Sequence, residues 1–532
     1  MKRSSWLPTL IVVLLVATLT PARAAKTVEF DALTIADINH AFDSGALTSE
    51  KLVQLCLARI QAYDRQGPSL RAVLTLNPKA LETARALDAE RKLRGPRSPL
   101  HGIPIVLKDN YNTFDLPTTG GSVLLEGSIP PDDAFVVKKL RAAGAIILAK
   151  VNLSEFASGG AHSSLGGQSL NPHDLTRTPS GSSGGTGVAI AAAYAPLGMG
   201  TDTGGSIRGP SSSNGIVGLK PTLGLLSRSG IIPLALSFDT GGPMGRNVAD
   251  VAIALGVMTG VDPADAATKK SEGRFEVDYS KYLRADALKG ARIGIARDFL
   301  GADPDVDWVV EASLDAMRKA GATIVDVRYP KWLLDAKDEF YNAIRRPEFP
   351  VQIADYLATI GPSYPKTLAE MIDRANRFNA VRADGAGPNP SRWALFTREA
   401  ESGTLDDYRY TSVHEHAMPM VRAVVEGILA SQRLDAIVYP TSSRRPGLIA
   451  ETGTTGAGAA SATNIANLTG FPDLIVPAGF TGDNLPVGLS FFGPAFSEPK
   501  LLALGYGFEQ ATRARRRPAH TPARPGESIS VP

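Results

Sequence analysis

The stretch Gly102-Ile-Pro-Ile-Val-Leu-Lys108 leads an unbroken apolar run directly into a lysine. Five apolar residues in a row are typical of a strand that is buried on both faces of a sheet. Similar runs recur with helical segments between them, which predicts an α/β fold. We expect one large domain whose mixed, twisted central β-sheet is covered by helices on both faces. The expected strands span 103–107, 145–149, 293–296, 323–327, 437–439, 474–476 and 487–491.

Helical periodicity surrounds the first of these strands. We expect helices within 34–95 and over 135–143. The capping signals are Thr34 and Thr48 at helix starts and Gly45 and Gly95 at helix ends.

Three further segments differ from the rest of the chain in composition. Residues 160–245 are rich in Gly, Ser, Thr and Pro around a helical run at 188–195, which favours tight backbone packing around a site. Residues 331–430 are helical in pattern and rich in aromatics, so they form either a variable insert that covers substrate or extra helices packed on the core. The basic, Pro-rich end over 513–532 is expected to be a loosely held tail.

The first 24 residues have the pattern of a secretory signal peptide. Lys2 and Arg3 are followed by an apolar stretch at 10–19, which is too short to span a bilayer comfortably, and by a small-x-small site at 22–24. We predict cleavage after Ala24, a mature domain over 25–512, and export to the periplasm or the extracellular space without a stable membrane anchor. An uncleaved anchor is the alternative.

Composition limits the remaining function classes. The 532 residues are 43% hydrophobic and 20% charged, which is ordinary for a soluble enzyme. The formal net charge of +3 falls to zero once the predicted signal peptide is removed, so we expect no nucleic-acid partner. Cys56, the single cysteine, lies among apolar residues at helical spacing and is expected to be a small buried residue.

Lys108 and two serines in Gly-rich settings carry the chemistry of the sequence. Ser182 lies in Gly181-Ser-Ser-Gly-Gly185, and Ser206 ends Thr201-Asp-Thr-Gly-Gly-Ser206. A serine hydroxyl needs a positioned base to act as a nucleophile, and a lysine can be that base if burial keeps it neutral. Glycines before a serine let backbone N–H groups approach a substrate oxygen. The set indicates acyl transfer through a Ser-Ser-Lys arrangement.

Five motifs in this order resemble the amidase signature family. They are the lysine motif at 102–110, Pro179-Ser-Gly-Ser-Ser-Gly-Gly-Thr186, Gly200-Thr-Asp-Thr-Gly-Gly-Ser-Ile-Arg208, Gly218-Leu-Lys-Pro-Thr222 and Gly242-Pro-Met244. The resemblance resumes at 468–479 and 485–489, and leaves out the variable 265–435 region.

The resemblance implies a role for each matched residue. Ser206 would be the nucleophile, Ser182 a bridging serine that follows a cis peptide bond, and Lys108 the final base. The implied oxyanion hole consists of the N–H groups of Thr203, Gly204, Gly205 and Ser206. The implied supporting residues are Ser183, Asp202 and Arg208.

Other interpretations of the same residues remain open. Taken singly, Lys108 could be a snorkelling surface lysine, and the serines could be turn or N-cap residues. The stretch 181–185 also matches the G-x-S-x-G nucleophile elbow of α/β-hydrolases with Ser183 as nucleophile, but it does not follow an apolar strand. The sequence has no His-Glu-x-x-His motif, no cysteine pair and no phosphate-binding glycine motif, so we expect neither a metal nor another cofactor.

The expected substrate is a carboxamide of a small molecule or a peptide. The stretches 215–233, 497–502 and 508–515 resemble the bacterial peptide amidase branch, which implies hydrolysis of C-terminal peptide amides. Aryl-acylamidase or carbamate hydrolase activity on the same fold is the alternative. The A-subunit of the glutamyl-tRNA amidotransferase shares the core motifs, but the predicted signal peptide disfavours it. A binding protein that has lost the chemistry is a further alternative.

Overall fold

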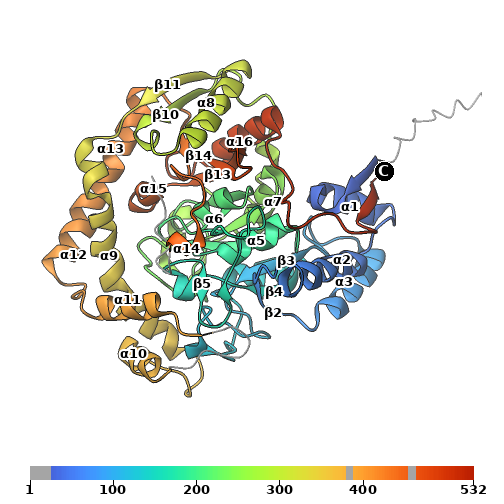
Figure 1. The fold of residues 1–532 in the computed structure, drawn as a ribbon, viewed down its shortest axis with the longest axis horizontal. Coiled ribbons are helices and arrows are strands. Elements are labelled where there is room, and N and C mark those ends of the chain that lie inside the picture. The colour runs from blue at the N-terminus through green and yellow to red at the C-terminus, as the bar shows by residue number, and fades with distance from the viewer. Residues whose placement is uncertain (1–25, 379–386, 453–462, 532) are drawn as a thin grey trace, which may run out of the picture.

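An 11-stranded sheet runs through the centre of the computed structural model, which describes residues 26–378, 387–452 and 463–531 (Figure 1). In order across the sheet the strands are β11 (Thr323–Val327), β10 (Arg292–Ala296), β12 (Ala436–Pro440), β14 (Pro486–Phe492), β13 (Asp473–Phe480), β8 (Val217–Lys220), β9 (Thr240–Gly245), β7 (Leu197–Asp202), β3 (Pro104–Lys108), β4 (Ile146–Val151) and β2 (Val73–Leu76). Strand β3 is parallel to β4 and β7, whereas β9 is antiparallel to β7 and β8. The predicted mixed sheet is therefore confirmed, and all seven strands expected from apolar runs belong to it.

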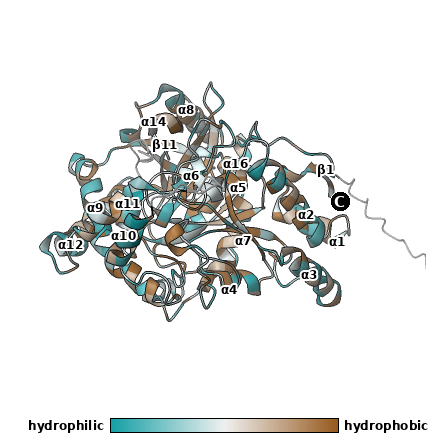
Figure 2. Cartoon of the chain, turned by 60° about the horizontal axis from the view of Figure 1, so that its bottom comes forward, coloured by the Kyte–Doolittle hydropathy of each residue, from teal (hydrophilic) through white to brown (hydrophobic). Residues whose placement is uncertain are grey.

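Helices flank the sheet; most bury one face, whereas α5 is buried throughout. They are α1 (Ile35–Asp43), α2 (Ser49–Ile60), α3 (Ala80–Arg94), α4 (Phe135–Ala142), α5 (Gly184–Ala191), α6 (Arg208–Ser213), α7 (Val248–Met258), α8 (Pro304–Lys319) and α16 (Glu498–Thr512). Figure 2 shows apolar and polar residues on the same helices, as expected for helices with one side on the core. Thr34 and Thr48 cap α1 and α2 through their side chains, as predicted.

The expectation of helices within 34–95 missed β2. This four-residue strand lies between α2 and α3 and pairs antiparallel with β4 at the edge of the sheet. Such a short apolar run cannot be distinguished from helix by periodicity, so only its pairing with β4 reveals it.

The Gly-rich segment holds the centre of the sheet together. It contributes β7, β8, β9, α5 and α6, and two short paired strands, β5 (His162–Ser163) and β6 (Gly167–Gln168). A Cβ atom on Gly198 of β7 would lie 2.6 Å from Thr186 Cγ2 of α5, so the glycine permits this close packing. The predicted tight backbone packing is confirmed here.

The 331–430 segment is helical, as predicted, and lies to one side of the sheet (Figure 1). It consists of α9 (Lys331–Ala358), α10 (Leu368–Arg377), α11 (Pro390–Ala400), α12 (Tyr408–Ser412) and α13 (Met418–Ser431); α14 (Ile449–Thr452) and α15 (Thr463–Thr469) follow. Its aromatics divide between two roles. Phe349 and Phe396 are buried and stacked, whereas Tyr408 is 86% exposed.

The C-terminal segment is held firmly, so the expectation of a loose tail was wrong. Strand β15 (Ser528–Val531) pairs antiparallel with β1 (Lys26–Glu29). The buried Glu527 carboxylate accepts from Arg59 Nη1 of α2 at 2.7 Å. These two residues are 468 positions apart in sequence, so local composition did not reveal their contact.

The predicted signal peptide, residues 1–24, lies outside the described residues. Within the described ranges, no helix combines the length and the apolar character that a bilayer crossing needs.

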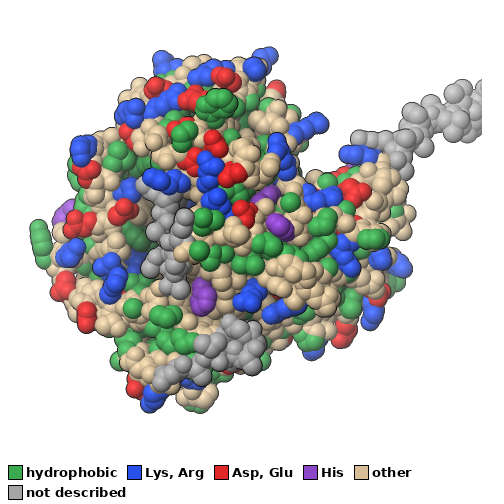
Figure 3. All heavy atoms as spheres, viewed as in Figure 1, with side chains coloured by type: hydrophobic (Ala, Val, Ile, Leu, Met, Phe, Trp, Pro, Cys, Tyr) green, Lys and Arg blue, Asp and Glu red, His purple; other side chains and the backbone are tan. Residues whose placement is uncertain are grey.

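Cys56 is buried, as predicted. On the face drawn in Figure 3, positive and negative side chains are interspersed.

Candidate active site

Lys108 ends β3 inside the protein, with its amine facing hydroxyl groups. Its Nζ atom lies 2.7 Å from Ser182 Oγ and 2.7 Å from Thr201 Oγ1, and 3.5 Å from the Thr201 carbonyl oxygen. Because burial disfavours a charged amine, the pKa of Lys108 is lowered to about 7, although Asp202 and Asp239 oppose the shift. The surface interpretation of Lys108 is therefore wrong, since its exposed fraction is 0%.

Ser182 is presented to Lys108 just before the start of α5. The Gly181–Ser182 peptide bond is cis, and the Ser182 carbonyl accepts from the backbone N–H of Ser154 at 2.9 Å. The neighbouring Ser183 is fully buried, and its hydroxyl bonds both the N–H and the carbonyl of Thr201 at 3.2 Å. This hydroxyl is occupied by strand β7, which disfavours Ser183 as an α/β-hydrolase nucleophile.

Ser206 closes a loop between β7 and α6, residues 203–206, which we call the 203–206 loop. Its side chain is partly exposed, and its carbonyl accepts from the N–H of Ser183 at 3.1 Å. This backbone bond brings the two serine motifs side by side. The backbone of Ser206 thus lies beside the motif that presents Ser182 to Lys108.

Asp202 anchors the 203–206 loop from within the protein. Its Oδ1 accepts from Gly205 N at 2.9 Å, and its Oδ2 accepts from Ile207 N at 3.0 Å. The guanidinium of Arg208 pairs with the same carboxylate at 3.0 Å and keeps its pKa far below the usual range, against the effect of burial. Asp202 and Arg208 therefore have the supporting position that the sequence implied, and the N–H of Gly205 is engaged in holding the loop.

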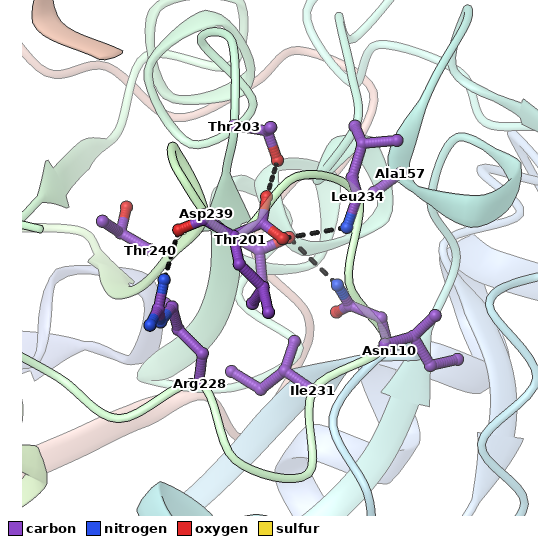
Figure 4. A pocket seen from close by; sticks show the side chains of 12 residues that line it. Asn110, Ala157, Thr201, Thr203, Arg228, Ile231, Leu234, Asp239 and Thr240 are labelled. Carbon is purple, nitrogen blue, oxygen red and sulfur yellow. Dashed lines mark hydrogen bonds between the residues drawn. The ribbon is translucent and has the colours of Figure 1, made fainter. Parts of the chain in front are cut away.

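A pocket adjoins this cluster on the side of Thr201 and Thr203 (Figure 4). Its apolar lining includes Ile231 and Leu234, and its polar side chains include Asn110, Arg228 and Asp239. Asn110 Nδ2 donates to Thr201 Oγ1 at 3.1 Å. Burial raises the pKa of the Asp239 carboxyl to about 6, while its hydrogen bond from Thr203 opposes the shift.

A family model described as Amidase matches residues 51–502. The chain belongs to the amidase family. It is 37% identical over 487 residues to the A-subunit of the glutamyl-tRNA(Gln) amidotransferase of Deinococcus radiodurans, and the match covers 90% of this chain and 96% of that protein.

Two solved structures resemble this amidase to different degrees. Native peptide amidase from Stenotrophomonas maltophilia is 38% identical with a TM-score of 0.83, and the match covers 92% of this chain and 99% of that one. The A-subunit of the glutamyl-tRNA(Gln) amidotransferase from Thermotoga maritima is 27% identical with a TM-score of 0.70, and the match covers 92% of this chain and 98% of that one. The resemblance to the peptide amidase branch is confirmed.

The amidase brings together the residues that the sequence singled out, but sequence reasoning missed three others. Thr201 contacts Lys108 and Ser183, Asn110 contacts Thr201, and Asp239 contacts Thr203 of the 203–206 loop. Only the fold brings these pairs together. Asn110 and Thr201 lie inside the motifs at 102–110 and 200–208, which is the signal that could have found them; Asp239 lies just before β9 and carries no such signal. Within the described residues no group of three or more His, Cys, Asp or Glu side chains could hold a metal ion.

Proposed function

We propose that this amidase is an exported hydrolase that cleaves carboxamide C–N bonds through a Ser206 acyl-enzyme, acting on C-terminal peptide amides or similar small amides. The observation that carries the proposal is the 2.7 Å approach of Lys108 Nζ to Ser182 Oγ in a buried site. A pKa lowered to about 7 leaves much of the lysine neutral at physiological pH, so it can accept a proton.

Thr201 supports this direction of proton transfer. Its Oγ1 accepts from the amide Nδ2 of Asn110, which can only donate, and it also lies within 2.7 Å of Lys108. A neutral amine can donate its N–H groups to Thr201 and turn its single lone pair to Ser182. The relay then runs from Ser206 through Ser182 to Lys108.

The reaction that we propose has two steps, acylation of Ser206 and hydrolysis of the acyl-enzyme, and both use the same proton relay. Ser206 Oγ loses its proton to Ser182, and Ser182 passes its own proton to Lys108. Ser206 Oγ then bonds the amide carbon. The oxyanion that forms is stabilised by N–H groups of the 203–206 loop other than that of Gly205, which donates to Asp202. The C–N bond breaks as the relay returns the proton to nitrogen, so that ammonia or an amine leaves. Water then attacks the ester by the same relay and releases the acid and Ser206.

Structural similarity favours a peptide amide as substrate. The TM-score is 0.83 with the peptide amidase against 0.70 with the amidotransferase chain, over similar shares of this chain. One solved relative of the same 38% identity is the peptide amidase in complex with the competitive inhibitor chymostatin. The apolar residues of the pocket, Ile231, Ile232, Leu234 and Leu236 among them, would suit an apolar part of such a substrate.

The 37% identity to an amidotransferase A-subunit favours a second candidate function, that of an amidotransferase A-subunit. The predicted export argues against it. The two candidates differ in whether the isolated chain turns over an amidated peptide.

The deciding experiment measures ammonia release from a C-terminally amidated dipeptide by the mature chain and by Ser206→Ala. We expect release by the wild type and none by the variant. Cleavage of an aryl anilide or a carbamate without ammonia release from the peptide would show that the substrate belongs to that class. The proposed mechanism would still stand. Full activity of Ser206→Ala would overturn the nucleophile assignment.

A further inference from the structure

Asp239 is a buried carboxylate between the 203–206 loop and the turn at 234–239. It accepts from the Thr203 hydroxyl at 2.5 Å and from Leu234 N at 2.8 Å (Figure 4). It also accepts from Ala235 N at 3.0 Å. A carboxylate that receives three such bonds can fix the groups that donate them.

The turn that carries Asp239 is itself attached to helix α9. Leu236 N donates to Gln352 Oε1 at 2.8 Å, and Ser237 N donates to Glu348 Oε2 at 3.1 Å. The ring of Phe238 stacks on Tyr341 of α9, with centroids 5.2 Å apart. Contacts with α9 therefore fix the turn that carries Asp239.

On its other side Asp239 acts at the first residue of the 203–206 loop. Asp202 holds the N–H groups of Gly205 and Ile207, whereas the hydroxyl of Thr203 donates to Asp239. We propose that Asp239 is a positioning residue that sets the orientation of the 203–206 loop through the Thr203 hydroxyl. The inference rests on the proposed function, because it requires Ser206 and the N–H groups of this loop to act on the substrate carbonyl.

The expected signature is a loss in kcat with little change in KM, because the loop contacts the oxyanion more strongly in the transition state than in the bound substrate. Asp239→Ala should lower kcat by about 10²-fold, the typical cost of misplacing a catalytic group by about 1 Å. Thr203→Val, which removes the hydroxyl and keeps the shape, should cause a similar loss. Thr203→Ser, which keeps the hydroxyl, should retain most of the activity.

A double variant separates positioning from a general structural role. If Asp239 acts through Thr203, Asp239→Ala combined with Thr203→Val should lose no more than either single change. Asp239→Asn provides a variant that can still fold, because its oxygen can accept from the N–H groups of Leu234 and Ala235 while its NH2 group donates to the Thr203 oxygen. Its kcat should fall between those of wild type and Asp239→Ala.

Asp250 offers a matched control for a buried carboxylate without this link. It accepts from Ile35 N at 2.9 Å and from Asn247, and its pKa is also raised to about 6 by burial. Asp250→Asn should lower the unfolding temperature and leave kcat and KM unchanged.

The kinetics use whichever amide the wild type cleaves, and the rate of Ser206 labelling by a fluorophosphonate provides a second readout. Failure of the proposed substrate class appears as absent ammonia release by the wild type, whereas failure of this inference appears as a difference between variants. Wild-type kcat in Thr203→Val, or additive losses in the double variant, would overturn it.

Discussion

Lys108 is a buried amine whose hydrogen-bond partners are the hydroxyls of Ser182 and Thr201 and the Thr201 carbonyl. The neighbouring carboxylates of Asp202 and Asp239 raise its pKa through space, but burial dominates and lowers it to about 7. By contrast, the buried Lys150 lies 3.2 Å from a carboxylate oxygen of Asp109. Two lysines on adjacent strands β3 and β4 thus have different partners, and Lys108 is the one that contacts a serine of the relay.

The pH dependence of the rate should report this environment. Only the neutral amine can accept a proton, so kcat/KM should be low below the Lys108 pKa and rise with pH through about 7. Lys108→Ala should lower kcat/KM by about 10²- to 10⁴-fold, the usual contribution of a general base, and should remove this limb. The measurement is a pH–rate profile of both proteins. Lys150→Ala, whose lysine bonds Asp109, serves as the control. A wild-type profile that does not rise near neutrality would contradict the role of Lys108 as a base.

At the scale of elements, glycine made the centre of the sheet hard to predict. Strands β7 and β9 contain Gly198, Gly200, Gly241 and Gly242, and glycine is depleted in strands generally. The reason for these residues is tertiary. A Cβ on Gly242 would lie 2.1 Å from the Leu219 carbonyl oxygen of β8. Apolar runs predicted the strands at 103–107 and 145–149 because these residues are buried and apolar. In β7 and β9, contacts with neighbouring elements determine the residues instead.

Gly198→Ala should therefore destabilise the amidase. Its Cβ would meet Thr186 Cγ2 at 2.6 Å and Val106 Cγ2 at 3.0 Å, and overpacking of this kind costs about 1–3 kcal/mol. Gly427→Ala in α13 is the control, because nothing lies within 4 Å of its Cβ position and alanine favours helix. Urea denaturation should show a lower midpoint for the first variant and an equal or higher one for the second. Equal midpoints for Gly198→Ala and wild type would show that α5 and β3 can move apart.

Only those site residues that lie in recognisable sequence motifs could be predicted from the sequence. Lys108, Ser182 and Ser206 are each marked by local pattern, and the fold brings their segments together from β3, the start of α5 and the end of β7. Thr201 lies inside the 200–208 motif, but its contact with Lys108 is made between two strands. Asp239 contacts Thr203 from a separate segment, and no local pattern marks it. The ion pair between Glu527 and Arg59 was missed because the two residues are far apart in the sequence.

Export is the prediction that concerns the whole molecule, and it rests on the first 24 residues alone. A basic start, a short apolar stretch and a small-x-small site at 22–24 predict removal of the segment after Ala24. Strand β1 begins at Lys26, so cleavage there leaves the β1–β15 pair intact. Expression with the natural N-terminus should give a protein outside the cytoplasm whose intact mass corresponds to a chain that starts at Ala25. Ala22→Glu should block cleavage and leave the full-length mass, while a soluble cytoplasmic protein that retains Met1 would contradict export and reopen the amidotransferase-like function.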